Sequence, residues 1–284
     1  MNAITRYFLL FVLALDTGGL IAKKKVEEEE LKPELRELMA IVEAEDALVL
    51  RMRDNVAPDK LRVELNHRID SIENQYRAYI EHYPDSVFAQ ILFGKFLRKT
   101  NQDDQAYKVF KAIQDDTPEI AVVNQHLALH ASEKGDYADA WKYFKNAIEL
   151  EPTTALYHYQ FGVFVYTYKT RLITKQFTTV SKAEDLIINA FRTAAELDPD
   201  NRDFKLRWAE TYFDMLNPNW NEVLPIWEEL MATSRNQFEK DVIRMQTARV
   251  LAELKRFYEA RQLVEGVDDP TLLESKQKLL DMLP

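Results

Sequence analysis

Residues 133–152, EKGDYADAWKYFKNAIELEP, place their apolar side chains at the spacing of an amphipathic helix. The stretch reads as the end of one helix, a turn at Gly135 and a second helix that Pro152 closes. Proline stops a helix because it lacks the amide hydrogen and clashes with the preceding turn. Glycine tolerates the positive φ that ends a helix, and we expect Asp136 to cap the next helix. The pattern predicts a helix–turn–helix unit.

This unit recurs with a period of 34 residues. The positions that keep the interval are the prolines Pro84, Pro118 and Pro152, the small residues Gly94, Ala128 and Gly162, the alanines Ala106 and Ala140, and the aromatics Phe110 and Phe144. Small residues let the two helices of a unit approach closely, and the aromatic residues fill the space beyond that contact. A fixed period of this length predicts a stacked array of helix pairs.

Later units depart from the period. Pro199 follows Pro152 by 47 residues, so the third unit holds 13 extra residues, which we expect between its two helices. The predicted organisation is an N-terminal charged helix at 23–57 and a solenoid at 58–284, with strong repeats at 87–120 and 121–154, an expanded repeat at 155–201 that contains an insert at 167–182, degenerate repeats at 202–237 and 241–274, and a C-terminal cap helix at 271–283.

The chain resembles the tetratricopeptide repeat family. The resemblance is carried by the motif small-x(11)-Ala-x(3)-aromatic-x(7)-Pro in a 34-residue unit, strongly over 84–165 and more loosely elsewhere in 58–284. It implies an all-α fold, a right-handed superhelical solenoid of helix–turn–helix repeats, whose first helices line a concave face. It also implies a non-enzymatic scaffold that binds a protein or peptide partner there, with no cofactor.

The family's groove positions transfer to one stripe on the first helix of each unit. The predicted groove residues are Phe88, Ile91, Lys95, Arg98, Lys99, Gln125, Leu129, Tyr159, Val163, Tyr166, Phe213 and Arg249. Such a groove is basic at one end, aliphatic and tyrosine-rich in the middle and acidic near the fourth unit, which suits a peptide with apolar anchors. Alternatively, the insert or the N-terminal helix of the chain covers the apolar middle.

The insert, TYKTRLITKQFTTVSK, carries four basic residues and no acidic residue. One interpretation is a lip beside the groove that binds an acidic partner through Lys169, Arg171 and Lys175. The other interpretation is an extended helix and loop whose cations are solvated or pair with neighbouring acids. The sequence favours the second interpretation.

The overall charge changes the range of partners. A formal net charge of -10 argues against non-specific binding to nucleic acid. The absence of cysteine excludes thiol catalysis, disulfides and cysteine-ligated zinc. With 46% hydrophobic residues the chain can bury a large core, and with only six glycines it favours helices over hairpins. Oligomeric state cannot be read from these numbers.

The N-terminus has the pattern of a secretory signal peptide, which we place at 1–22. Arg6 precedes nine apolar residues, and this apolar run is too short for a membrane span, which needs about 20 residues. We therefore expect export to a bacterial periplasm or the extracellular space, with no integral membrane span. The protein is cytoplasmic if the segment is not a signal peptide. If the leader is not cleaved, a membrane-associated assembly factor is the alternative.

His126 and His130 are the one pair with a spacing that suits a metal. Four residues apart on a helix, two imidazoles lie on one turn, so a metal- or ligand-binding envelope protein is a further alternative. A third ligand is not evident, and structural histidines are the favoured interpretation. The acidic run at 26–30 is interpreted as a solvated helix start. No glycine-rich phosphate loop or nucleophile elbow occurs in the sequence.

Overall fold

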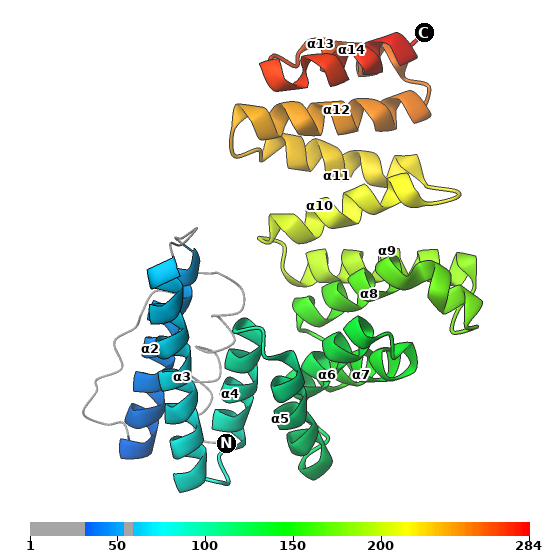
Figure 1. Cartoon of the computed structure of the whole chain (residues 1–284). Coiled ribbons are helices and arrows are strands. Elements are labelled where there is room, and N and C mark those ends of the chain that lie inside the picture. Colours follow the sequence, from blue (N-terminus) through cyan, green and yellow to red (C-terminus); the bar gives the residue numbers. More distant parts are fainter. Residues whose placement is uncertain (1–31, 54–58) are drawn as a thin grey trace. The chain divides into compact units, whose positions relative to one another are not determined.

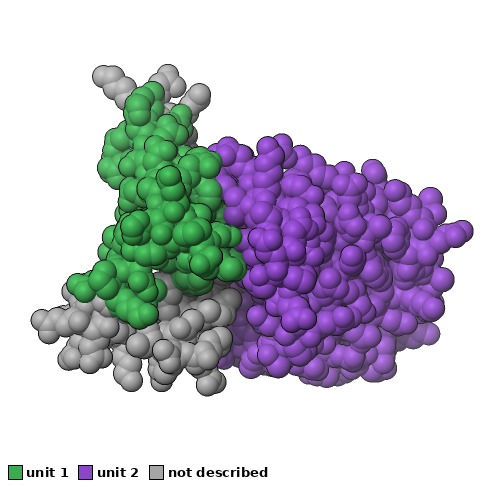
Figure 2. All heavy atoms as spheres, turned by 90° about the horizontal axis from the view of Figure 1, so that it is seen from below, with its two compact units in different colours: residues 1–96 green, residues 97–284 purple. Residues whose placement is uncertain are grey.

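The computed structural model describes residues 32–53 and 59–284. All the regular secondary structure in these residues is helical (Figure 1). The chain divides into two compact units, residues 1–96 and residues 97–284 (Figure 2). The predicted signal peptide and the acidic run at 26–30 lie outside the described residues.

Unit 1 contains α2 (Pro33–Arg53), α3 (Asp59–His82) and most of α4 (Val87–Lys99). Pro33 begins α2, where its missing amide hydrogen costs no helical hydrogen bond. The fully buried Tyr76 of α3 donates a hydrogen bond of 2.8 Å to the buried Glu45 of α2. The Tyr76 ring also packs 5.7 Å from the rings of Phe93 and Phe96. Aromatic packing and one buried hydrogen bond thus hold this unit together.

Unit 2 is a run of helices in which each packs against the next along the chain. Its elements are α5 (Asp103–Asp116), α6 (Ala121–Lys134), α7 (Tyr137–Leu150), α8 (Ala155–Thr174), α9 (Val180–Leu197), α10 (Arg202–Thr211), the 3₁₀ turn η2 (Tyr212–Asp214), α11 (Trp220–Ala232), α12 (Gln237–Glu253), α13 (Phe257–Glu265), the 3₁₀ turn η3 (Pro270–Leu272) and α14 (Leu273–Met282). This order is that of a helical solenoid, so the predicted fold class is confirmed. We call α6–α7, α8–α9, α10–α11 and α12–α13 the second to fifth repeats.

The small residues of the period lie at the helix contacts. Ala128 and Ala140 of the second repeat are fully buried. In the third repeat, a methyl group at Gly162 would lie 2.8 Å from the Phe191 ring and 3.1 Å from the Ala190 methyl group. Glycine is therefore required there for α9 to approach α8.

One turn geometry closes the first helix in several repeats. Asn101, Gly135, Gln176 and Lys255 all have positive φ. The residue after each of them donates its amide hydrogen to the carbonyl five positions earlier, for example Asp136 to Ala131 at 2.8 Å. This is the Schellman arrangement, and it satisfies carbonyls that the helix end leaves open. Only one of the four positions holds glycine, so sequence inspection identified the turn at Gly135 alone.

The expected capping role of Asp136 is wrong. Its side chain makes no capping hydrogen bond, and its ψ of 65° departs from the extended backbone of effective N-caps. Thr179 and Asn236, which do adopt that extended backbone, accept hydrogen bonds from Lys182 and Glu239 respectively. Residue type alone therefore does not ensure a cap, and Thr154 and Asn201 likewise make no capping hydrogen bond.

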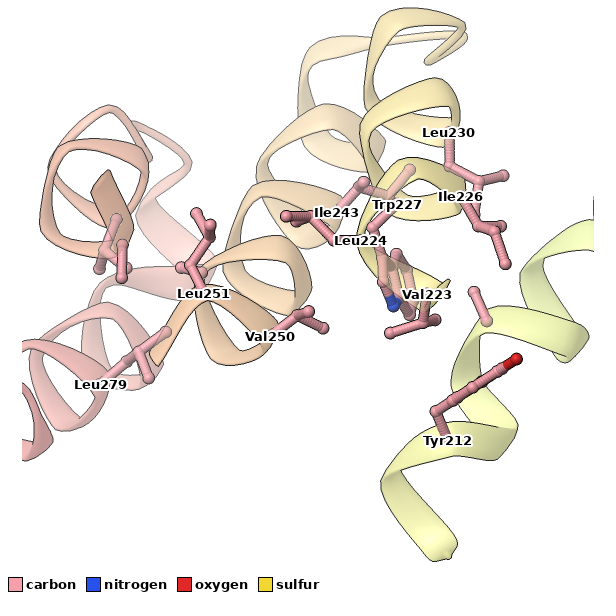
Figure 3. Close-up of a cluster of buried hydrophobic side chains, with 14 of the residues drawn as sticks. Tyr212, Val223, Leu224, Ile226, Trp227, Leu230, Ile243, Val250, Leu251 and Leu279 are labelled. Carbon is pink, nitrogen blue, oxygen red and sulfur yellow. The ribbon is translucent and has the colours of Figure 1, made fainter. Parts of the chain in front are cut away.

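The largest described core cluster joins the last two repeats to α14 (Figure 3). Trp227 of α11 is its largest member and is 1% exposed. Leu279 and Leu283 bury their side chains in the same cluster. Leu273 and Met282 of α14 remain exposed. α14 thus packs one apolar face against the preceding repeats and leaves its other face exposed.

The extra residues of the third repeat are mostly helical. Residues 167–174 continue α8, which is 20 residues long where α6 has 14. Residues 180–182 begin α9. The helix departs from regular geometry at Tyr168, with φ of -105° and ψ of 15°. The insert therefore lengthens the helices and leaves a short turn between them.

Candidate functional site

The predicted groove residues of α4 belong to both units. Phe88, Ile91 and Lys95 lie in unit 1, where Lys95 is buried. Arg98 and Lys99 lie in unit 2. The Arg98 guanidinium makes an ion pair of 2.9 Å with Glu133 at the end of α6. The basic end of the predicted groove is thus partly neutralised by its own repeat neighbour.

The remaining groove residues form contacts between successive first helices. We call these side chains the first-helix surface. They are Gln125 and Leu129 of α6, Tyr159, Val163 and Tyr166 of α8, Phe213 of η2 and Arg249 of α12. Gln125 of α6 is buried and donates a hydrogen bond of 2.8 Å to Gln160 of α8. Leu129 and Val163 are half-buried and pack on the second and third repeats' core cluster. Much of the predicted groove middle is therefore internal packing.

Tyr159 and Tyr166 of α8 differ in role. The Tyr159 ring packs 5.5 Å from the Phe191 ring and 4.6 Å from the Phe204 ring, so it belongs to the core between the third and fourth repeats. The Tyr166 hydroxyl donates a hydrogen bond of 2.6 Å to Asp214. This hydrogen bond, aided by partial burial, raises the pKa of Tyr166. Of the two tyrosines, Tyr166 is therefore the one whose hydroxyl makes a hydrogen bond at the protein surface.

Arginines cover the aromatic rings of this surface. The Arg207 guanidinium of α10 lies 4.1 Å from the Tyr166 ring centre. The Arg249 guanidinium of α12 lies 4.2 Å from the ring centre of Phe213. These contacts are cation–π interactions, and the exposed Arg249 keeps its charge at the surface. Sequence analysis missed Arg207, which lies one position beyond the stripe used to transfer the groove.

A pocket of about 290 Å³ opens beside Tyr166 in the third repeat. It is lined by Tyr166, Lys169, Thr170, Glu184, Ile187, Thr211, Asp214 and Met215. Five of these positions come from the long α8 and from α9, whereas the neighbouring α10 has only 10 residues. We attribute the hollow to this mismatch in helix length. Its position could not be read from the sequence, because it depends on where η2 follows α10.

The three predicted insert cations lie in different surroundings. The Lys169 ammonium is 2.7 Å from Glu184 Oε1 and lines the pocket. The Lys175 ammonium lies 5.4 Å from the Tyr137 ring centre. Arg171 is exposed. Lys169 thus pairs with an acid of its own repeat, which agrees with the second interpretation of the insert.

The histidine pair packs against aromatic rings. His126 stacks on Phe110 and His130 stacks on Tyr107, each at 4.4 Å between ring centres. Burial, followed by the nearby Lys134, lowers the pKa of His130. In the next repeat the positions equivalent to Tyr107 and His130 hold Trp141 and Phe164, whose rings also meet. His130 therefore occupies a position at which the next repeat also packs an aromatic ring.

The described residues bear on two of the alternatives, the metal site and the membrane anchor. No group of three His, Cys, Asp or Glu side chains is placed to hold a metal ion within 32–53 and 59–284. Over the same part of the chain, none of the helices combines the length and apolar character that crossing a bilayer needs.

Comparison with known proteins identifies the fold. No protein-family model matches the chain, and no curated protein matches it in sequence. Among solved structures, YrrB, described as a TPR protein with an unusual peptide-binding site, has a TM-score of 0.54 at 13% identity, covering 71% of this chain and 97% of YrrB. PilF of Pseudomonas aeruginosa has a TM-score of 0.47 at 14% identity, with 70% and 88% covered. TTC0263, a TPR protein of Thermus thermophilus, has a TM-score of 0.45 at 16% identity, with 77% and 99% covered.

The chain therefore has the fold of the tetratricopeptide repeat solenoids, as the sequence motif predicts. At this level of identity the likeness concerns the fold alone, so function is argued from the surface itself.

Proposed function

We propose that the chain is a non-enzymatic scaffold that binds an extended protein segment along the first-helix surface of unit 2. The observation that carries the proposal is the pocket between α8, α9 and η2, which adjoins the aromatic and arginine side chains of that surface. Side chains of an extended segment need such hollows, while the aromatic and arginine residues around them supply binding energy. YrrB, whose fold is similar, is described as having a peptide-binding site.

The lengthened third repeat is consistent with an accessible surface. Most of the insert is used to extend α8 and α9, and Lys169 is held against Glu184 of its own repeat. The proposed binding surface is narrower than the sequence stripe, because Gln125 and Tyr159 pack between repeats. Its expected contact residues are Tyr166, Phe213 and Arg249.

Selection from a displayed random peptide library with the full chain tests this proposal. Selected peptides should bind several-fold more weakly to Arg249→Ala, because this change removes an exposed cation that can stack on or pair with a ligand. Lys142→Ala, which removes an exposed cation from α7, is the matched control and should leave binding unchanged. If the selected peptides bind Arg249→Ala and Phe213→Leu as tightly as they bind the control, the binding site lies elsewhere.

We further propose an exported, cell-envelope setting for this scaffold, from the signal-like N-terminus at 1–22. Sequencing the N-terminus of the native protein tests it. A start near Lys23 supports export with cleavage, and an intact Met1 in a membrane fraction supports the anchored alternative. An intact Met1 in a cytosolic fraction would contradict both.

A further inference from the structure

The pocket of the third repeat is negatively charged. Among its lining residues Lys169 is the one cation, and Glu184 and Asp214 are the two carboxylates. The Lys169 ammonium lies 2.7 Å from Glu184 Oε1, so these two charges compensate each other inside the pocket. Asp214 accepts a hydrogen bond from the uncharged hydroxyl of Tyr166 and has no cationic partner among the lining residues. Counted over the lining side chains, the pocket therefore carries one unmatched carboxylate, while the Arg207 guanidinium lies outside this lining on the Tyr166 ring.

Two carboxylate oxygens remain available to a ligand. The hydrogen bonds that the described residues make to these groups end on Asp214 Oδ2 and on Glu184 Oε1. Asp214 Oδ1 and Glu184 Oε2 are left as acceptors. Charged donors make the strongest hydrogen bonds to carboxylates, and a guanidinium has five N–H groups with which to reach both.

The rest of the lining suits a long aliphatic stem. Ile187 and Met215 give apolar walls, and the Tyr166 ring gives a third. The volume of about 290 Å³ lies just below the roughly 300–1,000 Å³ typical of small-molecule pockets. A pocket with apolar walls and an acidic end matches the build of an arginine or lysine side chain, which buries its stem and directs its charged head to a polar partner.

We propose that this pocket binds a long basic side chain, arginine in preference to lysine, with its head at Asp214 and Glu184 and its stem against Ile187 and Met215. The inference rests on the proposed function in one respect: the basic side chain would belong to the segment that binds the first-helix surface. The basic insert sequence would suit an acidic ligand. The pocket instead suits a basic one, because Lys169 pairs with Glu184 and the Asp214 carboxylate has no cationic partner in the lining.

Nuclear magnetic resonance of the full chain, with labelled isoleucine and methionine methyl groups, tests the pocket directly. The probe is Nα-acetyl-arginine methylamide, and its neutral isostere Nα-acetyl-citrulline methylamide is the comparison. We expect saturable shifts of the Ile187 and Met215 methyl signals with the arginine probe at millimolar concentration, and at least several-fold weaker binding of the citrulline probe. Binding should weaken with added salt, because the pocket is partly open to solvent.

Two variants with opposite expected signs separate charge recognition from structural damage. Asp214→Asn should weaken the arginine probe about three- to tenfold, because it removes the excess charge. Lys169→Met should strengthen binding by a similar factor, because it removes the competing cation and leaves Glu184 unmatched. Asp185→Asn, an equal charge change on an exposed position of α9 that does not line the pocket, is the matched control and should have little effect.

The inference is overturned if the citrulline probe binds as well as the arginine probe, if neither methyl signal moves, or if Asp185→Asn weakens binding as much as Asp214→Asn. In any of these cases a library-selected peptide that depends on Arg249 would still support the scaffold. Conversely, the expected probe results together with a failed peptide selection would support the pocket and contradict the proposed function.

Discussion

The second and third repeats share one framework but differ in what they build on it. Both place a small residue on the first helix, Ala128 or Gly162, and both bury a phenylalanine on the second helix, Phe144 or Phe191. The second repeat keeps 14-residue helices, whereas the third extends its helices to 20 and 18 residues. Of these two repeats, the third alone contributes residues to the described pocket. The comparison shows that a repeat can keep its helix–helix contact, extend both helices beyond it, and form a pocket beside the extended part.

Removing the buried aromatic residues should have the largest effect, and an equal one in the two repeats. Phe144→Ala and Phe191→Ala each delete a fully buried ring, so each should lower the free energy of unfolding by about 3–5 kcal/mol. Chemical denaturation followed by circular dichroism measures this. A loss below about 1 kcal/mol in one repeat alone would show that the two frameworks are not equivalent.

The small residue should behave differently in the two repeats. Gly162→Ala places a methyl group 2.8 Å from the Phe191 ring, and we expect it to destabilise the protein by about 1–3 kcal/mol despite the better helix propensity of alanine. Ala128→Gly, at the equivalent position, should cost about 1 kcal/mol through helix propensity. Thermal unfolding of both variants compares them. If Gly162→Ala raised the melting temperature, the close approach of α8 and α9 would not require glycine.

These paired positions show what the sequence could and could not predict. The period of 34 residues predicted the helix pairs because proline, alanine and aromatic residues have direct steric roles at fixed offsets. The Schellman turns at Asn101, Gln176 and Lys255 were not predicted, because backbone hydrogen bonds can hold a residue other than glycine at positive φ. Asp136 was assigned a cap from its residue type, but its backbone conformation prevents one.

The candidate site was predicted only in part. The groove stripe contained Tyr166 and Phe213, since a helical spacing is enough to place residues on one face. It could not show that Tyr159 is packed between Phe191 and Phe204, because those partners come from other helices. Nor could it show that Lys169 meets Glu184 across the enlarged repeat. Contacts between elements of different length depend on register, which the sequence pattern does not fix.

The turns that end the first helices provide a prediction with opposite signs. Gly135 has a φ of 81°, so Gly135→Ala should destabilise the second repeat by about 1 kcal/mol. Gln176 has a φ of 62° with a β-carbon, so Gln176→Gly should stabilise the third repeat by up to about 1 kcal/mol. Denaturant titrations measure both changes. Destabilisation by Gln176→Gly would mean that the side chain of Gln176 contributes more than its backbone strain costs.

The smallest expected effect concerns pH and His130, the imidazole of the stacked Tyr107–His130 pair. Burial lowers the pKa of His130 from its ordinary 6.5, so the unfolded chain binds a proton there more readily than the folded chain does. The stability of the second repeat should therefore be constant above that unfolded value and fall as pH decreases through it. His130→Phe installs the residue that the third repeat carries at Phe164 and should flatten this part of the curve. Unfolding free energies measured between about pH 5 and pH 8 for both proteins check the sign. If the unfolding free energy of His130→Phe depends on pH as that of the wild type does, other groups cause the pH dependence. The stacked imidazole would then act like Phe164 in the third repeat.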